Sequence, residues 1–411
     1  MTLITDTGNL TEQFLDVRAT TDLLASRLSA EDQTPQSMPD ASPAKWHRAH
    51  TTWFFEEFIL RPDPSYTEYD PSYRYLFNSY YEAVGPRHPR PQRGLVTRPG
   101  IADVTRYREY VQDAVVRALP TGRLDERAQT LVELGCNHEQ QHQELLLMDI
   151  KHLFSTHPFA PVYIDRGADA KAPPAAQSWR AVAGGITEIG HDSVGFAYDN
   201  EGPRHQVLLE DFEIAERAVT NADWLEFMAD DGYRRSDLWL SDGWARIQAE
   251  GWDAPGYWDD QDGTWTTFTL SGRRPVVAGE PVCHVSFFEA DAFVRWAGAR
   301  LPTEFEWEAA AAARPDLRGQ LLDPDRVHPG LAGPAMVGDV WEWTASAYLP
   351  YPGFAPASGA VGEYNGKFMN DQHVLRGASA ATPAGHERLT YRNFFPAHSR
   401  WAFSGMRLAR S

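Results

Sequence analysis

The sequence predicts two domains, an N-terminal antiparallel bundle of four helices and a C-terminal α+β domain. At 411 residues, the chain is longer than one hydrophobic core usually supports. Residues 1–164 are mainly long amphipathic stretches with few internal breakers, whereas residues 179–411 alternate short β-like pieces with Gly- and Trp-rich loops. Residues 165–178 between them are small, polar and proline-bearing, which is typical of a linker.

The bundle is expected from four helical segments. Residues 11–28 carry a stripe of Leu and Val, and a second helix begins near Pro43, which is tolerated in a first turn, and runs to Pro62. Residues 102–118 and 126–154 are the third and fourth. Helices joined in this way favour an antiparallel bundle, and the long connection over residues 61–100 is typical of a functional loop.

The C-terminal domain is predicted to be α+β with much irregular structure. Its β-like pieces include HQVLLEDFEI (205–214), TTFTL (266–270) and HVLRG (373–377). Amphipathic helices are expected at about residues 220–230 and 287–299.

Composition excludes several classes of function. A net charge of −19 argues against nucleic acid and other polyanions as partners. The N-terminal segment lacks the basic and apolar regions of a signal peptide, and no apolar run is long enough to span a membrane. Two cysteines, Cys136 and Cys283, are too few for a disulfide framework. We therefore expect a cytoplasmic protein without membrane partners, and the sequence leaves a homo-oligomer open.

The sharpest chemical motif is His138-Glu-Gln-Gln-His142, in the fourth helix. Histidines at i and i+4 lie on one helix face and can bind one metal ion. The string also fits the HExxH pattern, in which Glu139 would be the base of a zinc hydrolase. Either His47 or His50 in the second helix can supply a third ligand by spacing. Three imidazoles leave positions open for substrates and dioxygen, which suits iron, but spacing alone does not separate iron from zinc.

Longer segments resemble known families. HRAHTTWFFEEFIL (47–60) and HEQQHQELLLMDIKH (138–152) resemble the metal-binding helices of DinB-like four-helix domains. PVCHVSFFEADAFVRWAGARLPTEFEWEAAA (281–311) and GDVWEWTAS (338–346) resemble the formylglycine-generating-enzyme or sulfatase-modifying-factor fold, a C-type-lectin-like variant. This domain pair, in this order and over nearly the whole chain, resembles the sulfoxide synthases of ergothioneine biosynthesis.

The resemblance implies a non-haem Fe(II) enzyme with the metal on His50, His138 and His142. Enzymes of this family use O2 to join a thiol to C2 of the imidazole of hercynine (N-α-trimethylhistidine) and oxidise the sulfur to a sulfoxide. Formylglycine generation is rejected, because the segment RGASAATPAG (376–385) lacks the required cysteine pair. The C-terminal domain is instead expected to close the iron site.

Two residues are assigned to hercynine by the same resemblance, and two more by the chemistry of its trimethylammonium group. Gln141 resembles the glutamine that hydrogen-bonds the substrate imidazole, and Asn393 resembles the asparagine at the amino-acid end. Phe394 and Phe395 are expected against the trimethylammonium group, since aromatic faces attract desolvated cations. Their alternatives are a solvated helix glutamine and ordinary core packing.

The thiol is predicted to be free cysteine. One branch of the family has Trp-Asp in place of Phe394-Phe395, and its aspartate binds the amino group of γ-glutamylcysteine. That branch also has a catalytic tyrosine just before the segment equivalent to Tyr364-Asn-Gly-Lys, where this chain has Ala-Val-Gly-Glu (360–363). Both departures favour the branch that uses cysteine.

The loop FNSYYEAVGPRHPRPQRG (77–94) resembles the cysteine-using branch, in which a tyrosine pair lines the iron site. Tyr80 and Tyr81 are therefore the catalytic candidates, one of them delivering a proton or an electron. Arg87 and Arg90 follow in the loop and suit the cysteine carboxylate, with solvated arginines as the alternative.

The predicted reaction is Fe(II)- and O2-dependent formation of hercynylcysteine sulfoxide from hercynine and cysteine. The same chemistry with γ-glutamylcysteine or a selenium donor stays open. A zinc- or nickel-dependent thiol transferase, as among other DinB-like proteins, and a lectin-like binding module with a structural metal are the alternatives from other classes.

Overall fold

The computed structural model describes residues 7–121, 123–166 and 173–411, and its chain divides into two compact units. The helical unit comprises Met1–Pro158 together with Ser358–Tyr364. The α+β unit comprises Phe159–Ala357 and Asn365–Ser411. Of the predicted linker, residues 167–172 lie outside the described residues. Among the helices of the described ranges, none is long and apolar enough to cross a membrane.

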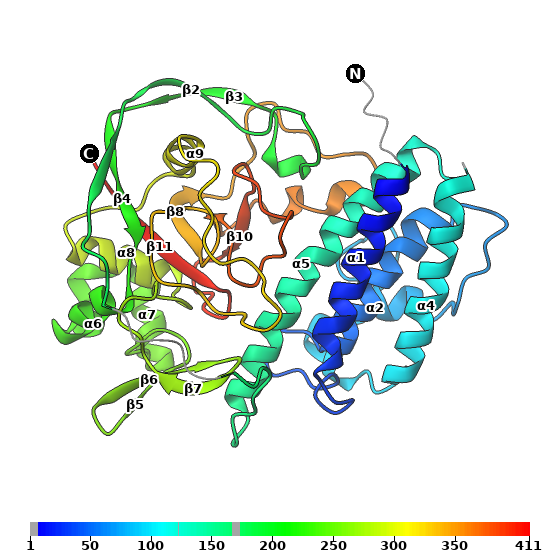
Figure 1. Cartoon of the computed structure of the whole chain (residues 1–411), viewed down its shortest axis with the longest axis horizontal. Coiled ribbons are helices and arrows are strands. Elements are labelled where there is room, and N and C mark those ends of the chain that lie inside the picture. The colour runs from blue at the N-terminus through cyan, green and yellow to red at the C-terminus, as the bar shows by residue number, and fades with distance from the viewer. Residues whose placement is uncertain (1–6, 122, 167–172) are drawn as a thin grey trace. The chain divides into compact units, whose positions relative to one another are not determined.

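The helical unit contains the predicted bundle (Figure 1). Its helix α1 packs on α5, and α2 packs on both α4 and α5, which confirms the fold class expected for this part of the chain. The long connection carries one short helix, α3. The helices are α1 (Thr7–Ser26), α2 (Ala44–Phe55), α3 (Tyr73–Phe77), α4 (Ile101–Ala118) and α5 (Glu126–Thr156), with short helical turns η2 (Arg90–Leu95), η3 (Leu119–Thr121) and η7 (Ala360–Glu363).

Helix α2 continues into a π-helical turn, η1 (Glu56–Leu60), that anchors the long connection. The buried carboxylate of Glu56 accepts hydrogen bonds from the hydroxyl of Tyr66 (2.7 Å) and the backbone N–H of Tyr69 (2.9 Å). It also accepts one from the hydroxyl of Tyr107 on α4 (2.6 Å). Single π-helical turns are frequent at functional sites, and this one ties the start of the connection to the bundle.

Helices α2 and α5 approach closely because α5 has a glycine at the crossing. A Cβ atom on Gly135 would lie 2.5 Å from a ring carbon of Phe55. Gly135 is one turn before His138. A larger residue there would push α5, which carries the HxxxH motif, away from α2, which carries His47 and His50.

A buried ionic network braces the bundle. Glu139 on α5 accepts hydrogen bonds from Arg18 on α1 (3.0 Å) and Arg108 on α4 (3.1 Å). Arg108 also bonds Asp22 (2.9 Å), which pairs with Arg48 of α2 (3.2 Å). Side chains from all four long helices therefore meet in one charged cluster. Its arginines and Glu139 are buried and depend on their partners because burial makes an unpaired charge costly, whereas the side chain of Asp22 is 47% exposed.

The α+β unit is built on a mixed sheet in the order β1-β4-β11-β8-β9-β10. All neighbours in it are antiparallel except β11 and β8, which are parallel. The remaining strands form a β2–β3 ribbon and a β5-β6-β7 sheet. The strands are β1 (Trp179–Val182), β2 (Gly185–Ile189), β3 (His205–Leu209), β4 (Phe212–Ala218), β5 (Trp258–Gln261), β6 (Thr264–Thr269), β7 (Gly272–Pro275), β8 (Trp341–Ala347), β9 (Gln372–Gly377), β10 (Asn393–Pro396) and β11 (Ser404–Arg410).

Three of the four α-helices described in this unit, α6, α8 and α9, begin at a side-chain cap. The side chains of Thr220, Ser286 and Thr303 each accept a hydrogen bond from the backbone N–H three residues on. Helices α6 and α8 match the predicted segments, whereas α7 and α9 were not predicted. The helices are α6 (Asn221–Ala229), α7 (Ser241–Glu250), α8 (Phe287–Trp296) and α9 (Glu304–Ala312), with turns η4 (Asp199–Glu201), η5 (Gly232–Arg234), η6 (Ser236–Leu238) and η8 (Gly366–Phe368).

Helix α9 seals part of the core of this unit against β8 and β9. Its Trp307 is fully buried and donates from Nε1 to Glu342 of β8 (2.6 Å). Glu342 in turn accepts from Arg407 of β11 (3.0 Å). The predicted α+β class is thereby confirmed for the second part of the chain.

Candidate metal site

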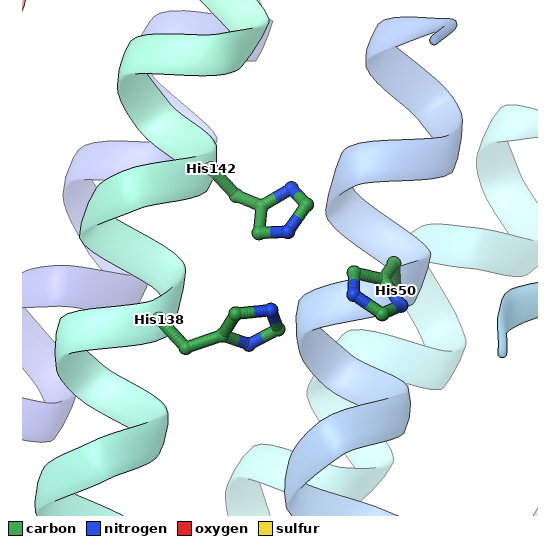
Figure 2. Close-up of side chains that lie close together, drawn as sticks. All are labelled: His50, His138 and His142. Carbon is green, nitrogen blue, oxygen red and sulfur yellow. The ribbon is translucent and has the colours of Figure 1, made fainter. Parts of the chain in front are cut away.

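Three histidines of the helical unit converge on one point (Figure 2). His50 comes from α2, and His138 and His142 come from α5, one turn apart. One ring nitrogen of each lies within 4.8 Å of the others, the spacing expected of ligands to a single ion. Of the two α2 histidines that fitted by spacing, the structure brings His50 into this group, and His47 lies beside it.

Burial keeps all three rings neutral. His50 is completely buried and His138 almost so. Burial, helped by the neighbouring histidines, holds the pKa of His50 and of His142 well below the usual range. Burial and the nearby His47 lower the pKa of His138 to about 3. At neutral pH the rings therefore carry the lone pairs that a metal ion requires.

The hydrogen bonds of these rings leave nitrogens without partners. His50 Nδ1 lies 2.6 Å from the carbonyl oxygen of Phe77, which only accepts, so its proton is on Nδ1. His50 Nε2 and both ring nitrogens of His138 are buried and have no hydrogen-bond partner among the described residues. A buried polar atom without a partner costs about 1–3 kcal/mol. A divalent cation would supply the missing partner, so the residues fit a metal.

The geometry of Glu139 argues against the zinc hydrolase alternative. Its carboxylate is completely buried and is shared between Arg18 and Arg108. A general base must instead reach a metal-bound water. Glu139 is therefore a bracing residue of the bundle.

Gln141 contacts a tyrosine from a distant part of the sequence. The hydroxyl of Tyr364 donates a hydrogen bond to the side-chain oxygen of Gln141, and the Tyr364 ring centroid lies 5.7 Å from that of His138. The neighbouring Glu363 accepts hydrogen bonds from the backbone N–H groups of Glu82 (3.0 Å) and Ala83 (2.9 Å). The segment Ser358–Tyr364 thus joins the loop of the predicted tyrosine pair. Tyr364 was not among the predicted site residues, although it directly follows residues 360–363, where the related branch has its tyrosine.

The predicted pair Tyr80 and Tyr81 packs among aromatic side chains of the helical unit. Their ring centroids are 4.6 Å apart, and Tyr81 is completely buried. Tyr81 packs against Trp53 (5.7 Å), which itself stacks on His50 (5.5 Å). Tyr80 is half-buried, with its ring centroid 6.3 Å from that of Tyr364. The pair is therefore near the three histidines, with Trp53 between Tyr81 and His50.

The two predicted arginines are engaged at the surface of the helical unit. Arg87 pairs with Glu82, and Arg90 donates to the backbone carbonyl of Asp40. Both are at least partly exposed. These contacts are those expected of arginines at the surface. They are also compatible with arginines that exchange these partners for a substrate carboxylate.

Arg93 was missed by the sequence analysis, although it continues the spacing of Arg87 and Arg90. It is buried, its guanidinium carbon lies 3.3 Å from the ring centroid of Trp46, and Trp46 stacks on His50 (4.5 Å). Burial holds the pKa of Arg93 well below its usual value. Its polar contacts are the hydroxyls of Ser42 (2.9 Å) and Ser79 (3.0 Å), and no carboxylate pairs with it within the part of the chain that the structure describes.

The predicted hercynine contacts Asn393, Phe394 and Phe395 belong to strand β10 of the α+β unit. All three are half-buried. Phe394 stacks on Tyr348 (4.1 Å), and Phe395 meets Trp401 edge to face (5.5 Å). These contacts agree with the packing alternative and leave part of each ring exposed.

Comparison with known families assigns both parts of the chain. Residues 13–146 match the DinB superfamily. Residues 168–322 and 330–411 match the sulfatase-modifying factor enzyme 1-like domain. This is the predicted pair of domains in the predicted order.

Two hercynine oxygenases align with this protein over nearly the whole chain. A hercynine oxygenase of Mycolicibacterium thermoresistibile is 34% identical, over 98% of this chain and 94% of its own length. A hercynine oxygenase of Mycolicibacterium smegmatis is also 34% identical, over 91% and 92%. Ergothioneine biosynthesis protein 1 of Schizosaccharomyces pombe is 27% identical, over 53% of this chain and 28% of its own length. With its two domains and a three-histidine site in the first of them, this chain belongs to the hercynine oxygenase family.

Proposed function

We propose that this protein is an Fe(II)- and O2-dependent sulfoxide synthase that joins cysteine to the imidazole C2 of hercynine, giving hercynylcysteine sulfoxide. The observation that carries the proposal is the cluster of His50, His138 and His142, neutral rings of which the first two are buried and the third half-buried, in a chain of the hercynine oxygenase family. Bound there, iron would supply O2 binding and activation. An iron ion held by three histidines would keep further coordination positions for the two substrates and O2.

Gln141 and Tyr364 would orient hercynine. The Tyr364 hydroxyl holds the Gln141 oxygen, which fixes the direction of the amide. An amide fixed in this way can hydrogen-bond the substrate imidazole without first losing rotational freedom. Asn393, Phe394 and Phe395 are proposed for the amino-acid end and the trimethylammonium group, on the strength of the family resemblance and the affinity of aromatic faces for cations.

The tyrosine pair would supply the proton or electron that the reaction needs. A phenol is suited to this because its O–H is both acidic and oxidisable. The completely buried Tyr81 and the half-buried Tyr80 are the two donors proposed.

Arg93 is added to Arg87 and Arg90 as a partner for the cysteine carboxylate. A buried guanidinium without a carboxylate partner among the described residues suits an anionic substrate group. The absence of a carboxylate at Phe394-Phe395 supports cysteine over γ-glutamylcysteine, whose free glutamyl amino group needs an acidic partner.

The experiment is O2 uptake by anaerobically purified, Fe(II)-loaded protein with hercynine and each thiol in turn, with mass spectrometry of the product. Uptake coupled to hercynylcysteine sulfoxide is expected with cysteine. The matched variants are His142→Ala, which removes a ligand, and His152→Ala, a histidine of the same helix that bonds Ser37 (2.7 Å). Only the first is expected to abolish turnover.

Three outcomes would contradict parts of this proposal. A preference for γ-glutamylcysteine or a selenium donor would change the substrate and keep the chemistry. Stoichiometric zinc or nickel with no coupled O2 uptake would replace the oxygenase by a metal-dependent thiol transferase. Tight metal binding without turnover of any thiol would indicate a binding module.

A further inference from the structure

His47 connects one of the three site histidines to a buried carboxylate. It lies on α2, three residues before His50, and is only 3% exposed. Its Nδ1 is 2.8 Å from Nδ1 of His142, and its Nε2 is 2.9 Å from Oδ2 of Asp149. Both ring nitrogens of His47 are therefore committed to side chains of α5.

Asp149 is itself held in place. It lies two turns beyond His142 on α5 and is 6% exposed. Its Oδ2 also accepts a hydrogen bond from the backbone N–H of Ser42 (2.7 Å), which precedes α2. The chain of contacts runs from Ser42 through Asp149 and His47 to His142, and its first donor is a backbone N–H that can only donate.

The direction of each hydrogen bond follows from this chain. Because Asp149 Oδ2 accepts, His47 must donate from Nε2. A ring with one proton then has an accepting Nδ1, so His142 must donate from its own Nδ1. This arrangement leaves the lone pair of His142 on Nε2.

The other two site histidines, His50 and His138, have no side-chain hydrogen-bond partner of this kind among the described residues. His50 obtains the same tautomer from a backbone carbonyl, that of Phe77 (2.6 Å). Neither ring nitrogen of His138 has a hydrogen-bond partner among the described residues. Among the described residues, His142 is therefore the one of the three whose tautomer depends on other side chains.

We propose that His47 and Asp149 are positioning residues that set the tautomer of His142 and hold its ring in the orientation that binds the metal. Partners of this kind around a ligand typically contribute 10- to 100-fold in metal affinity. The proposal rests on the metal site of the proposed function, and it concerns the residues behind that site rather than the reaction.

The first test reads the tautomer directly in the metal-free wild-type protein. Long-range ¹H–¹⁵N spectra of histidine-labelled protein distinguish Nδ1–H from Nε2–H rings. The His142→Gln variant, which lacks one histidine signal, assigns the resonance. We expect His142 to carry its proton on Nδ1 and His47 on Nε2. The opposite tautomer at His142 would overturn the proposal without reference to any metal.

The second test measures the affinity for Co(II) alone, by chelator competition and by the visible spectrum of the bound ion. His47→Phe and Asp149→Leu remove the hydrogen bonds, and each is expected to weaken binding about 10- to 100-fold. In His47→Gln the amide keeps one donor and one acceptor, and Asp149→Asn keeps an accepting oxygen. Both conservative variants are expected to recover most of the affinity. His152→Phe serves as the control, and its affinity is expected to match wild type.

The outcomes separate this proposal from the proposed function. Wild-type affinity in both His47→Phe and Asp149→Leu would overturn the positioning role and leave the iron site intact. The positioning role would also be overturned if His47→Phe lost Co(II) affinity while His47→Gln did not recover it and Asp149→Leu kept it. His47 would then be a direct ligand. If wild-type protein binds neither Co(II) nor Fe(II), the proposed function fails, and the ¹⁵N spectra alone decide the tautomer.

Discussion

At the scale of single residues, the hydrogen bond from Tyr364 to Gln141 joins two parts of the chain that lie far apart in the sequence. The two residues are 223 positions apart, yet the hydroxyl of one holds the amide oxygen of the other. The ring of Tyr364 also approaches His138. Tyr364 is therefore expected to act on substrate orientation through Gln141, and Tyr80 or Tyr81 on the chemical step.

Tyrosine-to-phenylalanine variants test this division. Tyr364→Phe removes one hydrogen bond, worth about 1 kcal/mol, so we expect a roughly fivefold higher KM for hercynine with kcat little changed. Removing the donor itself, by Tyr80→Phe or Tyr81→Phe, is expected to lower kcat by about 10²-fold or more. Steady-state rates of sulfoxide formation measure both constants. A collapse of kcat in Tyr364→Phe at unchanged KM would transfer the donor role to Tyr364.

At the scale of elements, the site depends on how four helices are held together. Gly135 lets α2 and α5 approach, and the cluster around Glu139 ties α5 to α1 and α4. Gly135 lies on the face of α5 that carries His138 and His142, toward α2, whereas the contacts of Glu139 lie on another face. The motif HEQQH therefore has two functions in this chain, since its histidines face the site and its glutamate faces the ionic network.

Glu139→Gln separates the two functions. Replacing the carboxylate leaves Arg18 and Arg108 buried with one negative charge fewer, so we expect a loss of about 3–5 kcal/mol in the free energy of unfolding. Urea denaturation of the metal-free protein measures this free energy of unfolding. Glu250→Gln, which breaks an exposed pair with Arg246, is the control and is expected to cost less than about 1 kcal/mol. If Glu139→Gln stayed fully stable but lost all turnover, Glu139 would be a catalytic base after all.

At the scale of the whole molecule, the helical unit is not continuous in sequence. It includes Ser358–Tyr364, a segment that follows most of the α+β unit along the chain. Glu363 anchors this segment by accepting the N–H groups of Glu82 and Ala83. The loop of the tyrosine pair and the segment Ser358–Tyr364 are therefore expected to be ordered together.

Glu363→Ala tests that coupling. Hydrogen bonds to a charged group contribute about 1.5–3 kcal/mol, so amide exchange at Glu82 and Ala83 should accelerate about 10- to 100-fold. Hydrogen–deuterium exchange followed by mass spectrometry reads this segment directly. Glu57→Ala, which removes the partner of Arg74 in the same connection, is the comparison and should leave exchange at residues 82–83 unchanged. Equal exchange in Glu363→Ala and wild type would show that the segment does not order the loop.

The sequence alone determined the properties that depend on near neighbours. Helical periodicity predicted the four long helices, and the i, i+4 spacing placed His138 and His142 on one face because a helix repeats every 3.6 residues. Matches of whole segments identified the two domains and the family. Each of these follows from residues close together in the chain, whose geometry the backbone conformation sets.

Only the tertiary structure decided between residues that local spacing treats alike. His47 and His50 lie on the same helix. His47 hydrogen-bonds His142 and Asp149 of α5, whereas Nε2 of His50 has no hydrogen-bond partner among the described residues. Arg93 is buried on Trp46 while Arg90 is exposed. Tyr364 reaches Gln141 across 223 positions. Burial and partner choice arise where separate segments pack, and no local pattern encodes which segments will meet.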